Sequence, residues 1–395
     1  MRRTAILVSI LVLLAGVGVA PAAGAASSSV ADTDEPNATY EPCEFPVELT
    51  DATGETITIE EEPERVTTIG PSAAQTMWEI GGEQQVVGVS QFAHYLDGAA
   101  EKANVSAEFG ASVEQVVATD PDLVLAPNVS AQDVEPLREA GLTVYHFPEA
   151  TETDDVAEKT ETIGKLTGNC EGAAEANAWM YANVDALNSV SDEADERPDA
   201  LYPLGDGFVA GGNTFIDEII TVSGADNVAN EHEGFPQLSD EVLLELDPEV
   251  LVVTMPGVFL EQEPYASTTA GETESEVVVE VQWLNQPAPR SIVEATHTLA
   301  SQLHPDIYDE SVYVERSEIQ VESVEDAAED EGTEAEETEA QETEAQETEA
   351  EDADEDAPEE TPDDDAADVT TPGFGVVVAL VGTLLAALLA LRRVE

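Results

Sequence analysis

Apolar and polar residues follow the same order in two segments of the chain, residues 111–127 and 238–254. Shifting one segment by 127 positions superposes Ser112 on Ser239 and Glu114 on Glu241, and it brings two Asp-Pro pairs into register. Each segment predicts a short helix that stops at Asp-Pro, because the residue before proline is pushed out of the helical region. The apolar run that follows lacks polar alternation, which favours a strand covered on both faces of a parallel sheet. Two such units predict two similar α/β lobes.

The remaining pattern alternates short strands with helices, which is typical of parallel sheets. The first lobe is predicted to hold strands at 47–50, 56–60, 66–70, 85–90 and 143–147 and helices at 74–80 and 131–140; the second is predicted to hold strands at 200–204 and 277–281 and helices at 214–222 and 291–303. Between them, residues 153–190 carry one apolar stripe at helical spacing, which predicts a long connecting helix. Glycines at 164, 168 and 172 leave a break in that helix open.

This pattern gives a domain plan for the whole chain. The plan is a signal peptide at 1–26, an N-terminal linker and leading strands at 27–59, an N-terminal lobe at 60–150, a connecting helix at 151–193, a C-terminal lobe at 194–310, a disordered acidic linker at 325–370 and a sorting signal with a transmembrane helix at 371–395. The leader has two arginines, an apolar core and small residues near Ala25, as secretory signals do. Residues 27–41 are polar and are expected to be disordered.

The excess of acidic residues predicts a strongly negative protein surface. The chain has 86 acidic and 12 basic residues, and only 24 of the acids fall in 325–368, so the folded part is acidic too. In molar salt the Debye length falls to about 3 Å and such self-repulsion is screened, which indicates a protein of an extreme halophile. An acidic face for one cationic partner is the alternative. Nucleic acid is excluded as a partner because no basic stripe is present to displace counterions.

Two cysteines and three Asn-X-Ser/Thr sequons are compatible with an exported chain. Cys43 and Cys170 are the only cysteines, and in an oxidising compartment this predicts one disulfide. The alternative is that Cys170 is a small buried apolar residue. The sequons begin at Asn37, Asn104 and Asn128 and are compatible with export, although such short matches also arise by chance.

The C-terminal end reads as a spacer and a membrane segment. Repeats of the type ETEA keep residues 325–370 extended through like charge. An apolar run at 376–391 then precedes Arg392 and Arg393. With the two residues before it, the run reaches the length of a short transmembrane helix whose arginines suit the cytoplasmic side.

Four motifs together resemble a known family. They are RVTTIGPSAAQTMWEIGG with VVGVSQFAHY, then SVEQVVATDPDLVLAP, GNTFIDEIITVSGADNVA and LSDEVLLELDPEVLVV. Over residues 60–305 the chain resembles the substrate-binding proteins of ABC importers for cobalamin, haem or ferric siderophores. The resemblance implies two Rossmann-like lobes joined by a long helix, a ligand held between them, little hinge motion, and partners that are the permease and ATPase subunits. It also implies a monomer without a cofactor or enzymatic activity.

The tail resembles an archaeal sorting signal marked by Pro372, Gly373 and Phe374. In proteins with that signal the segment is removed and replaced by a lipid. This resemblance implies a protein anchored by an acidic stalk at the outer face of the cell membrane.

The same family implies a docking role for Glu114 and Glu241. One glutamate in each lobe pairs with permease arginines in such proteins, and two fixed carboxylates would define a two-point register for the partner. The alternative is that both are ordinary solvated acids of an acidic surface.

Candidate ligand residues follow from the fold, because ligands of doubly wound sheets bind beyond the carboxyl ends of strands. The predicted set is Ser72, Phe92, His94, Tyr95, Phe109, Asn128, Phe208, Phe235, Met255, Trp283 and Arg290. Aromatic faces suit a corrin, porphyrin or catecholate plane, and an arginine suits a carboxylate or phosphate. Each of these residues could instead be a wall or core residue.

Other chemistries remain as alternatives. His94, His146 and His232 could converge on a zinc or manganese ion, and His94 or Tyr95 could ligate haem iron. The segment Gly205 to Ala210 matches a dinucleotide fingerprint, but it runs into further glycines instead of a helix. A secreted enzyme is disfavoured because GxSxG, HExxH and P-loop patterns are missing from the sequence. A purely structural surface protein is disfavoured by the two ordered α/β lobes.

Overall fold

The computed structural model describes residues 37–194 and 196–324. The predicted signal peptide, acidic linker and C-terminal sorting segment lie outside these residues. Within them, no helix is both long and apolar enough to cross a membrane.

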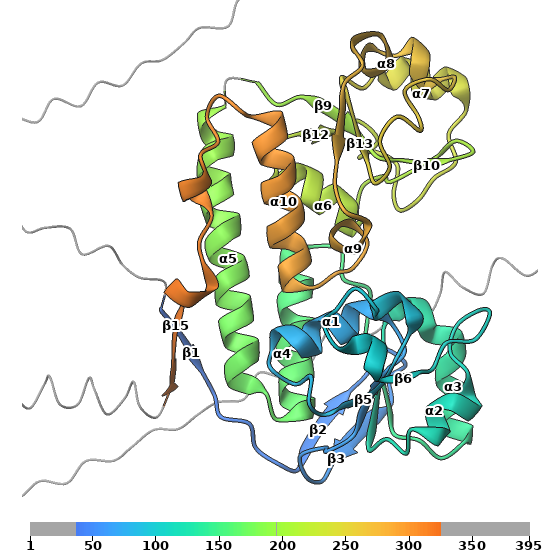
Figure 1. The fold of residues 1–395 in the computed structure, drawn as a ribbon, viewed down its shortest axis with the longest axis vertical. Helices are drawn as coiled ribbons and strands as arrows, with labels where there is room; N and C mark the ends of the chain where they lie inside the picture. Colours follow the sequence, from blue (N-terminus) through green and yellow to red (C-terminus); the bar gives the residue numbers. More distant parts are fainter. Residues whose placement is uncertain (1–36, 195, 325–395) are drawn as a thin grey trace, which may run out of the picture. The chain divides into compact units, whose positions relative to one another are not determined.

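The N-terminal lobe is built on a parallel five-stranded sheet (Figure 1). In sheet order its strands are β6 (Ala103–Asn104), β5 (Val86–Val89), β4 (Val66–Thr68), β7 (Leu123–Ala126) and β8 (Val144–His146). Its helices are α1 (Pro71–Glu79), α2 (Val113–Ala118) and α3 (Ala131–Glu139). An antiparallel hairpin, β2 (Val47–Thr50) with β3 (Thr56–Ile59), precedes the sheet. The predicted α/β lobe is therefore confirmed.

The C-terminal lobe repeats this plan with four parallel strands. Their order is β12 (Asp226–Asn227), β9 (Asp199–Leu201), β13 (Val250–Val253) and β14 (Glu276–Val278). The helices are α6 (Phe215–Val222), α7 (Asp240–Leu246), α8 (Thr269–Thr273), α9 (Val281–Leu284) and α10 (Pro289–Leu303), and a hairpin joins β10 (Pro203–Gly205) to β11 (Phe208–Val209). The strand expected at 277–281 is thus shorter, because its last residue already begins α9.

Two helices, not one, connect the lobes. The apolar stripe at 153–190 is divided into α4 (Thr153–Thr167) and α5 (Cys170–Glu193), which pack against each other. Gly168 ends α4 in the left-handed conformation, with φ of 80°, which glycine adopts without steric cost. The break that the glycines left open is therefore present, and α5 is the long helix that runs beside α10 (Figure 1).

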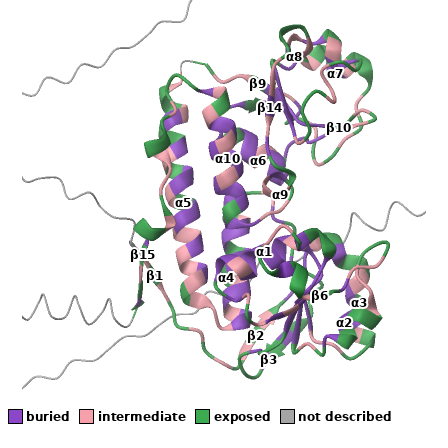
Figure 2. Cartoon of the chain, viewed as in Figure 1, coloured by how far each residue is buried: buried purple, intermediate pink, exposed green. Residues whose placement is uncertain are grey.

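Both sheets are covered on both faces, as the apolar strand pattern predicts. In β7 and β13 every residue is buried (Figure 2). In the N-terminal lobe α1, α4 and α5 cover one face and α2 and α3 the other, whereas in the C-terminal lobe α5, α6 and α10 face α7 and α8 across the sheet. This burial places the strand ends, not the strand faces, at the surface.

The two ends of the described chain meet in a separate parallel pair, β1 (Asn37–Tyr40) with β15 (Gln320–Ser323), here called the terminal clasp. The clasp packs along α5. It corrects the expectation of disorder for residues 37–41, since the pairing partner lies too far along the chain for local composition to reveal it. Next to it, Cys43 and Cys170 form the predicted disulfide, with their Cα atoms 5.6 Å apart.

Candidate functional site

The duplicated unit is the same structure in both lobes. Ser112 and Ser239 cap α2 and α7, and each side chain accepts a backbone N–H at 3.4 Å. Asp120 and Asp247, the residues before the two prolines, both adopt positive φ, of 47° and 40°. Asp-Pro therefore ends the helix as predicted, through a left-handed aspartate. Glu114 and Glu241 therefore hold equivalent positions, exposed in the first turn of each helix.

Loops from neighbouring strands of the N-terminal lobe approach closely at the carboxyl edge of its sheet. A Cβ atom on Gly70, after β4, would lie 2.3 Å from Cγ of Pro127, after β7. Proline at the first position of α1 is preorganised for the helix, so Gly70 and Pro71 turn the chain sharply from strand into α1. The N-terminal half of α1 and the turn after β7 therefore lie together at the carboxyl edge of the N-terminal sheet.

A polar junction joins the two lobes beneath this edge. Gln75 of α1 is fully buried; its Oε1 accepts from the Tyr95 hydroxyl at 2.5 Å, and its Nε2 donates to Ser291 Oγ of α10 at 2.9 Å. The Tyr95 ring meets the edge of the Trp283 ring at a centroid distance of 6.0 Å. The Arg290 guanidinium lies 5.3 Å from the centre of the same Trp283 ring. Three predicted ligand residues, Tyr95, Trp283 and Arg290, are thus in one group.

Two buried ionisable groups lie at the same junction. Glu79 Oε2 accepts from the Arg290 backbone N–H at 3.1 Å, and Lys159 Nζ donates to the carbonyl of Pro287 at 2.6 Å. Burial raises the pKa of Glu79 to about 7, although hydrogen bonds from Arg290 and Gln75 oppose the shift. Burial also lowers the pKa of Lys159 to about 7. Because each group contacts the other half of the molecule, the junction fixes the lobes against each other.

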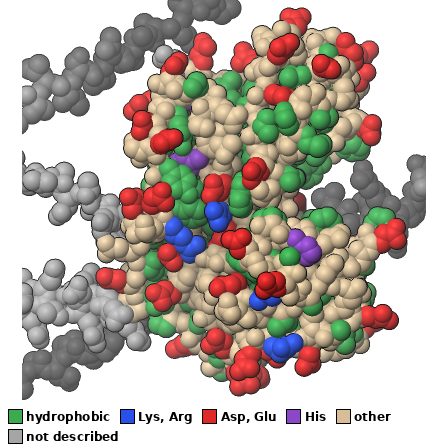
Figure 3. Space-filling model, in the orientation of Figure 1, with side chains coloured by type: hydrophobic (Ala, Val, Ile, Leu, Met, Phe, Trp, Pro, Cys, Tyr) green, Lys and Arg blue, Asp and Glu red, His purple; other side chains and the backbone are tan. Residues whose placement is uncertain are grey.

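Exposed apolar side chains from both lobes lie in the segments that follow the carboxyl ends of the strands, which are loops, short 3-10 helices, the hairpin strand β11 and the start of α9. They include Phe92, Phe109 and Val129 of the N-terminal lobe and Phe208, Phe235, Met255 and Val281 of the C-terminal lobe. Phe109 is 83% exposed and Phe92 67%, values that a core role does not explain. In Figure 3 hydrophobic side chains gather on the upper lobe beside the hollow that separates it from the lower lobe. These exposed apolar residues suit a flat, hydrophobic ligand.

The predicted polar residues outside this group differ in how far they are buried. Ser72 is 5% exposed in the first turn of α1, Asn128 is half-buried in a short 3-10 helix, and His94 is exposed after another. His146 is buried at the end of β8, with Nδ1 3.2 Å from the Ala126 carbonyl oxygen. In the described part of the chain, no three or more His, Cys, Asp or Glu side chains are grouped to hold a metal ion.

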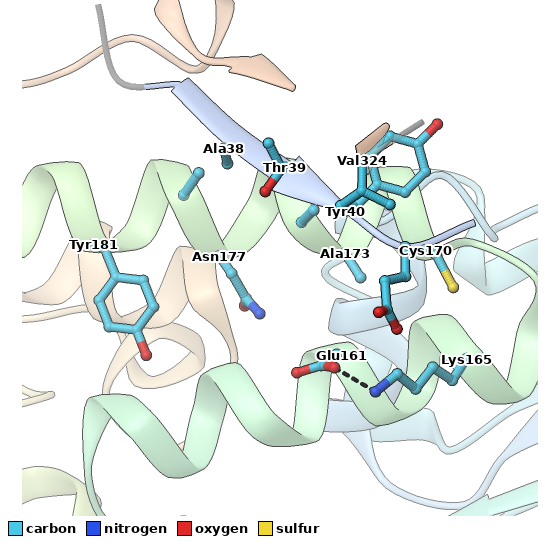
Figure 4. A pocket seen from close by; sticks show the side chains of 13 residues that line it. Ala38, Thr39, Tyr40, Glu161, Lys165, Cys170, Ala173, Asn177, Tyr181 and Val324 are labelled. Atoms are coloured by element: carbon cyan, nitrogen blue, oxygen red, sulfur yellow. Dashed lines mark hydrogen bonds and ion pairs between the residues drawn. The ribbon is translucent and has the colours of Figure 1, made fainter. Parts of the chain in front are cut away.

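A cavity of about 460 Å³ lies elsewhere, between β1, α4 and α5 beside the disulfide (Figure 4). Three of its polar side chains bind within the protein: Lys165 pairs with Glu161, Tyr181 donates to Asp154 Oδ1 at 2.9 Å, and Asn177 Nδ2 donates to the Ala157 carbonyl at 2.9 Å. The other polar atom of Asn177, Oδ1, is buried without a hydrogen-bond partner among the described residues. None of the predicted ligand residues lines it. We therefore place the candidate site at the junction and the exposed apolar residues, not in this cavity.

The pattern did not predict Gln75, Glu79, Lys159 and Ser291. A signal was present in part, since Gln75 and Glu79 interrupt the predicted helix 74–80 at positions four apart and so share one face. Lys159 and Ser291 gave no such signal, because their partners come from the opposite half of the chain.

Comparison with known proteins now identifies the family. Residues 66–288 match the family described as periplasmic binding protein. The chain belongs to the periplasmic binding protein family. Its C-terminal residues 371–393 match the PGF-CTERM motif, which confirms the sorting signal at Pro372, Gly373 and Phe374.

Relatives and solved structures agree with this membership. The chain is 46% identical over 278 residues to a "Cobalamin-binding protein" of Halobacterium salinarum, covering 66% of this chain and 75% of that one. It is 27% identical over 282 residues to an uncharacterized ABC transporter substrate-binding lipoprotein of Bacillus subtilis, covering 67% and 88%. The vitamin B12 binding protein of Vibrio cholerae (TM-score 0.54, 21% identity, 61% of this chain and 96% of that one) and the haem-binding protein RhuT of Roseiflexus sp. RS-1 (TM-score 0.56, 21%, 61% and 99%) share its fold.

As a periplasmic binding protein, the chain is a binding protein and not an enzyme. Its family pairs with ABC transporters and works outside the cytoplasm, and the PGF-CTERM motif places it at the archaeal cell surface. The predicted family, class and location are confirmed. The individual ligand and docking residues stay predictions.

Proposed function

We propose that this protein captures a corrinoid of the cobalamin type between its two lobes and delivers it to the membrane subunits of an ABC importer. The single observation that carries the proposal is the group formed by Tyr95, Trp283 and Arg290, which joins residues of both lobes. Exposed apolar residues lie close to it along the chain, Phe92 before Tyr95 and Val281 before Trp283. A corrin ring offers a flat apolar face for the aromatic side chains, and the side-chain amides and the nucleotide-loop phosphate of a cobalamin accept hydrogen bonds from an arginine.

The relative from Halobacterium salinarum supports the choice of a corrinoid over haem or a ferric siderophore. At 46% identity it is more informative about a ligand than the haem-binding structures, which match at 19–23% identity and support the fold alone. Delivery to the importer is proposed to use Glu114 and Glu241, one on each lobe, as contacts for basic side chains of the membrane subunits.

Equilibrium binding of cyanocobalamin to the full chain in molar KCl and mild detergent tests this proposal. We expect one equivalent to bind, and Trp283→Ala to weaken binding about 30-fold, because aromatic anchors at the centre of a site carry much of the affinity. Tyr181→Ala is the control: Tyr181 is an exposed aromatic residue of α5 outside the junction, and its hydroxyl donates to Asp154 Oδ1.

Haemin, a ferric hydroxamate and zinc are tested in the same way. One-equivalent binding of any of these in place of cyanocobalamin would replace the corrinoid in the proposal. Binding of none of the four would remove the proposed function.

A further inference from the structure

The duplicated unit exposes an apolar side chain as well as a carboxylate in each lobe. Val117 is 43% exposed and Leu244 is 42% exposed. The same shift of 127 positions that relates Glu114 to Glu241 relates Val117 to Leu244. An exposed apolar residue alone is normal at a protein surface, but the same exposure at equivalent positions of two lobes is a patterned feature.

The helices fix where these side chains point. In each unit the residue before the exposed apolar one, Val116 or Leu243, is fully buried and sets the rotation of the helix. Residues three apart lie on one face of a helix, so Val117 neighbours Glu114 and Leu244 neighbours Glu241. The identical serine caps and left-handed aspartates keep both short helices in this phase. Each lobe therefore presents one carboxylate beside one apolar side chain.

Neither apolar side chain serves the core of its own lobe. The cluster around Val116 includes Ala111, Val113 and Leu142 at its edge but not Val117, and the cluster around Leu243 includes Leu246 but not Leu244. Packing within the lobes therefore gives no reason for two apolar residues at these positions.

We propose that Val117 and Leu244 are docking contacts for the membrane subunits of the importer, each inserted beside the neighbouring glutamate into an apolar pocket flanked by a basic side chain. The proposal rests on the proposed function and adds what the docking surface consists of. Charge complementarity selects the basic neighbour, since the carboxylates need cations. The duplication selects a partner with two equivalent sites. In Figure 1 both α2 and α7 lie on the right, whereas the terminal clasp lies on the left.

In high salt, Val117 and Leu244 are expected to contribute more to docking than the two glutamates do. An exposed ion pair is largely screened where the Debye length is about 3 Å, whereas burial of apolar surface is not screened. On a chain with a formal net charge of −74, acids alone also cannot define one face. The apolar pair supplies the contact that persists in molar salt, and the glutamates supply its register.

The test is cobalamin uptake at limiting concentration by cells of the source archaeon that lack their own copy and carry the full chain or a variant. The variant Val117→Thr with Leu244→Asn keeps the side-chain size and removes the apolar surface. We expect uptake to fall at least 10-fold in molar salt, because burial of each side chain supplies about one order of magnitude of affinity. The purified variant should bind cobalamin within twofold of the parent, with an unchanged amount at the cell surface.

Two controls separate a docking effect from a general one. Ile307→Thr alters another exposed apolar residue, 37% exposed and outside the duplicated unit, and should leave uptake unchanged. The exchange Val117→Leu with Leu244→Val keeps both contacts apolar and should retain uptake. Uptake by the polar double variant equal to that of Ile307→Thr would overturn the inference while leaving the proposed function intact. Uptake that does not depend on the parent chain would overturn both.

Discussion

The helix α2 of the N-terminal lobe and the helix α7 of the C-terminal lobe begin and end alike, but different residues hold the turn after each. In the N-terminal lobe Arg65 donates from Nε to the carbonyl of Asp120 at 2.7 Å. In the C-terminal lobe Thr269 donates from its backbone N–H to the Asp247 carboxylate at 2.7 Å. The local sequence thus determines the helix, turn and strand, whereas residues distant in the sequence determine which hydrogen bonds stabilise each turn.

A second difference between the lobes concerns their arginines. Arg138 of α3 pairs with the fully buried carboxylate of Asp51 and with Glu55 at 2.8 Å, and its side chain is 15% exposed. Arg197, before β9, pairs with Asp226 at 2.8 Å, and its side chain is 32% exposed beside a 57% exposed carboxylate. The N-terminal lobe therefore depends on a buried ion pair and the C-terminal lobe on a half-exposed one.

Arg138→Met and Arg197→Met test this difference most strongly. We expect Arg138→Met to lower the free energy of unfolding by about 4 kcal/mol, because it leaves a buried carboxylate without its cation. Arg197→Met should cost about 1 kcal/mol, since its pair is partly solvated and salt screens it. Chemical denaturation in molar KCl measures both, with Arg138→Lys as the control that keeps the charge. Equal losses in the two variants would contradict the comparison.

The junction between the lobes gives a pH-dependent test. The pKa of Glu79 is raised from 4.5 to about 7, so between these values the unfolded chain loses this proton while the folded chain keeps it. Stability from this group is therefore lost as the pH rises from about 4.5 to 7. Relative to Glu79→Gln, the parent should lose about 3 kcal/mol over that window, at 1.36 kcal/mol per pKa unit.

Other groups near the junction must be kept constant in that comparison. Arg290, Arg316 and Tyr95 interact with Glu79 and are present in both proteins, whereas the pKa of Lys159 is lowered by burial and raised by Glu79, so it falls further in Glu79→Gln. His297, whose pKa burial lowers to about 4, has the opposite sign, because its contribution is lost as the pH falls below 6.5. It cancels in the difference between parent and variant. Parallel stability curves from pH 4.5 to 7.5 would show that Glu79 is not the group that titrates.

The smallest expected effect separates the two turns themselves. Glycine tolerates positive φ better than aspartate, so Asp120→Gly should be neutral or stabilise by about 0.5 kcal/mol. Asp247→Gly gains the same relief but loses the carboxylate that accepts from Thr269 N and Oγ1, at 2.7 and 3.1 Å, so it should cost about 1 kcal/mol. Thermal unfolding of both variants measures the sign, and a stabilised Asp247→Gly would show that the Thr269 bonds contribute little.

Much of the fold could be predicted because its signals are local. The Asp-Pro stops, the serine caps and the runs at 123–125 and 250–252 act within a few residues, and the structure confirms all of them. The terminal clasp was not predicted, because its register depends on a partner from the opposite end of the described chain.

Likewise, the candidate site contains residues that could be predicted from local topology and contacts that could not. Carboxyl-edge positions such as Tyr95, Trp283 and Arg290 follow from topology alone, and the structure brings these three together. The buried contacts of Gln75 with Ser291 and of Lys159 with Pro287 depend on how two lobes meet, which no stretch of one lobe encodes. Ser72, by contrast, satisfied the topological criterion but is buried in the first turn of α1.

The terminal clasp also bears on the order in which the protein is completed. β1 is made early and β15 late among the described residues, and pairings between distant segments form late because the loop between them must close first. Pairing of the two strands therefore marks a chain that has been synthesised at least as far as Ser323. A chain that stops before Gln320 would leave β1 without this partner, and an unpaired strand edge near a chain end is a target for aggregation and proteolysis.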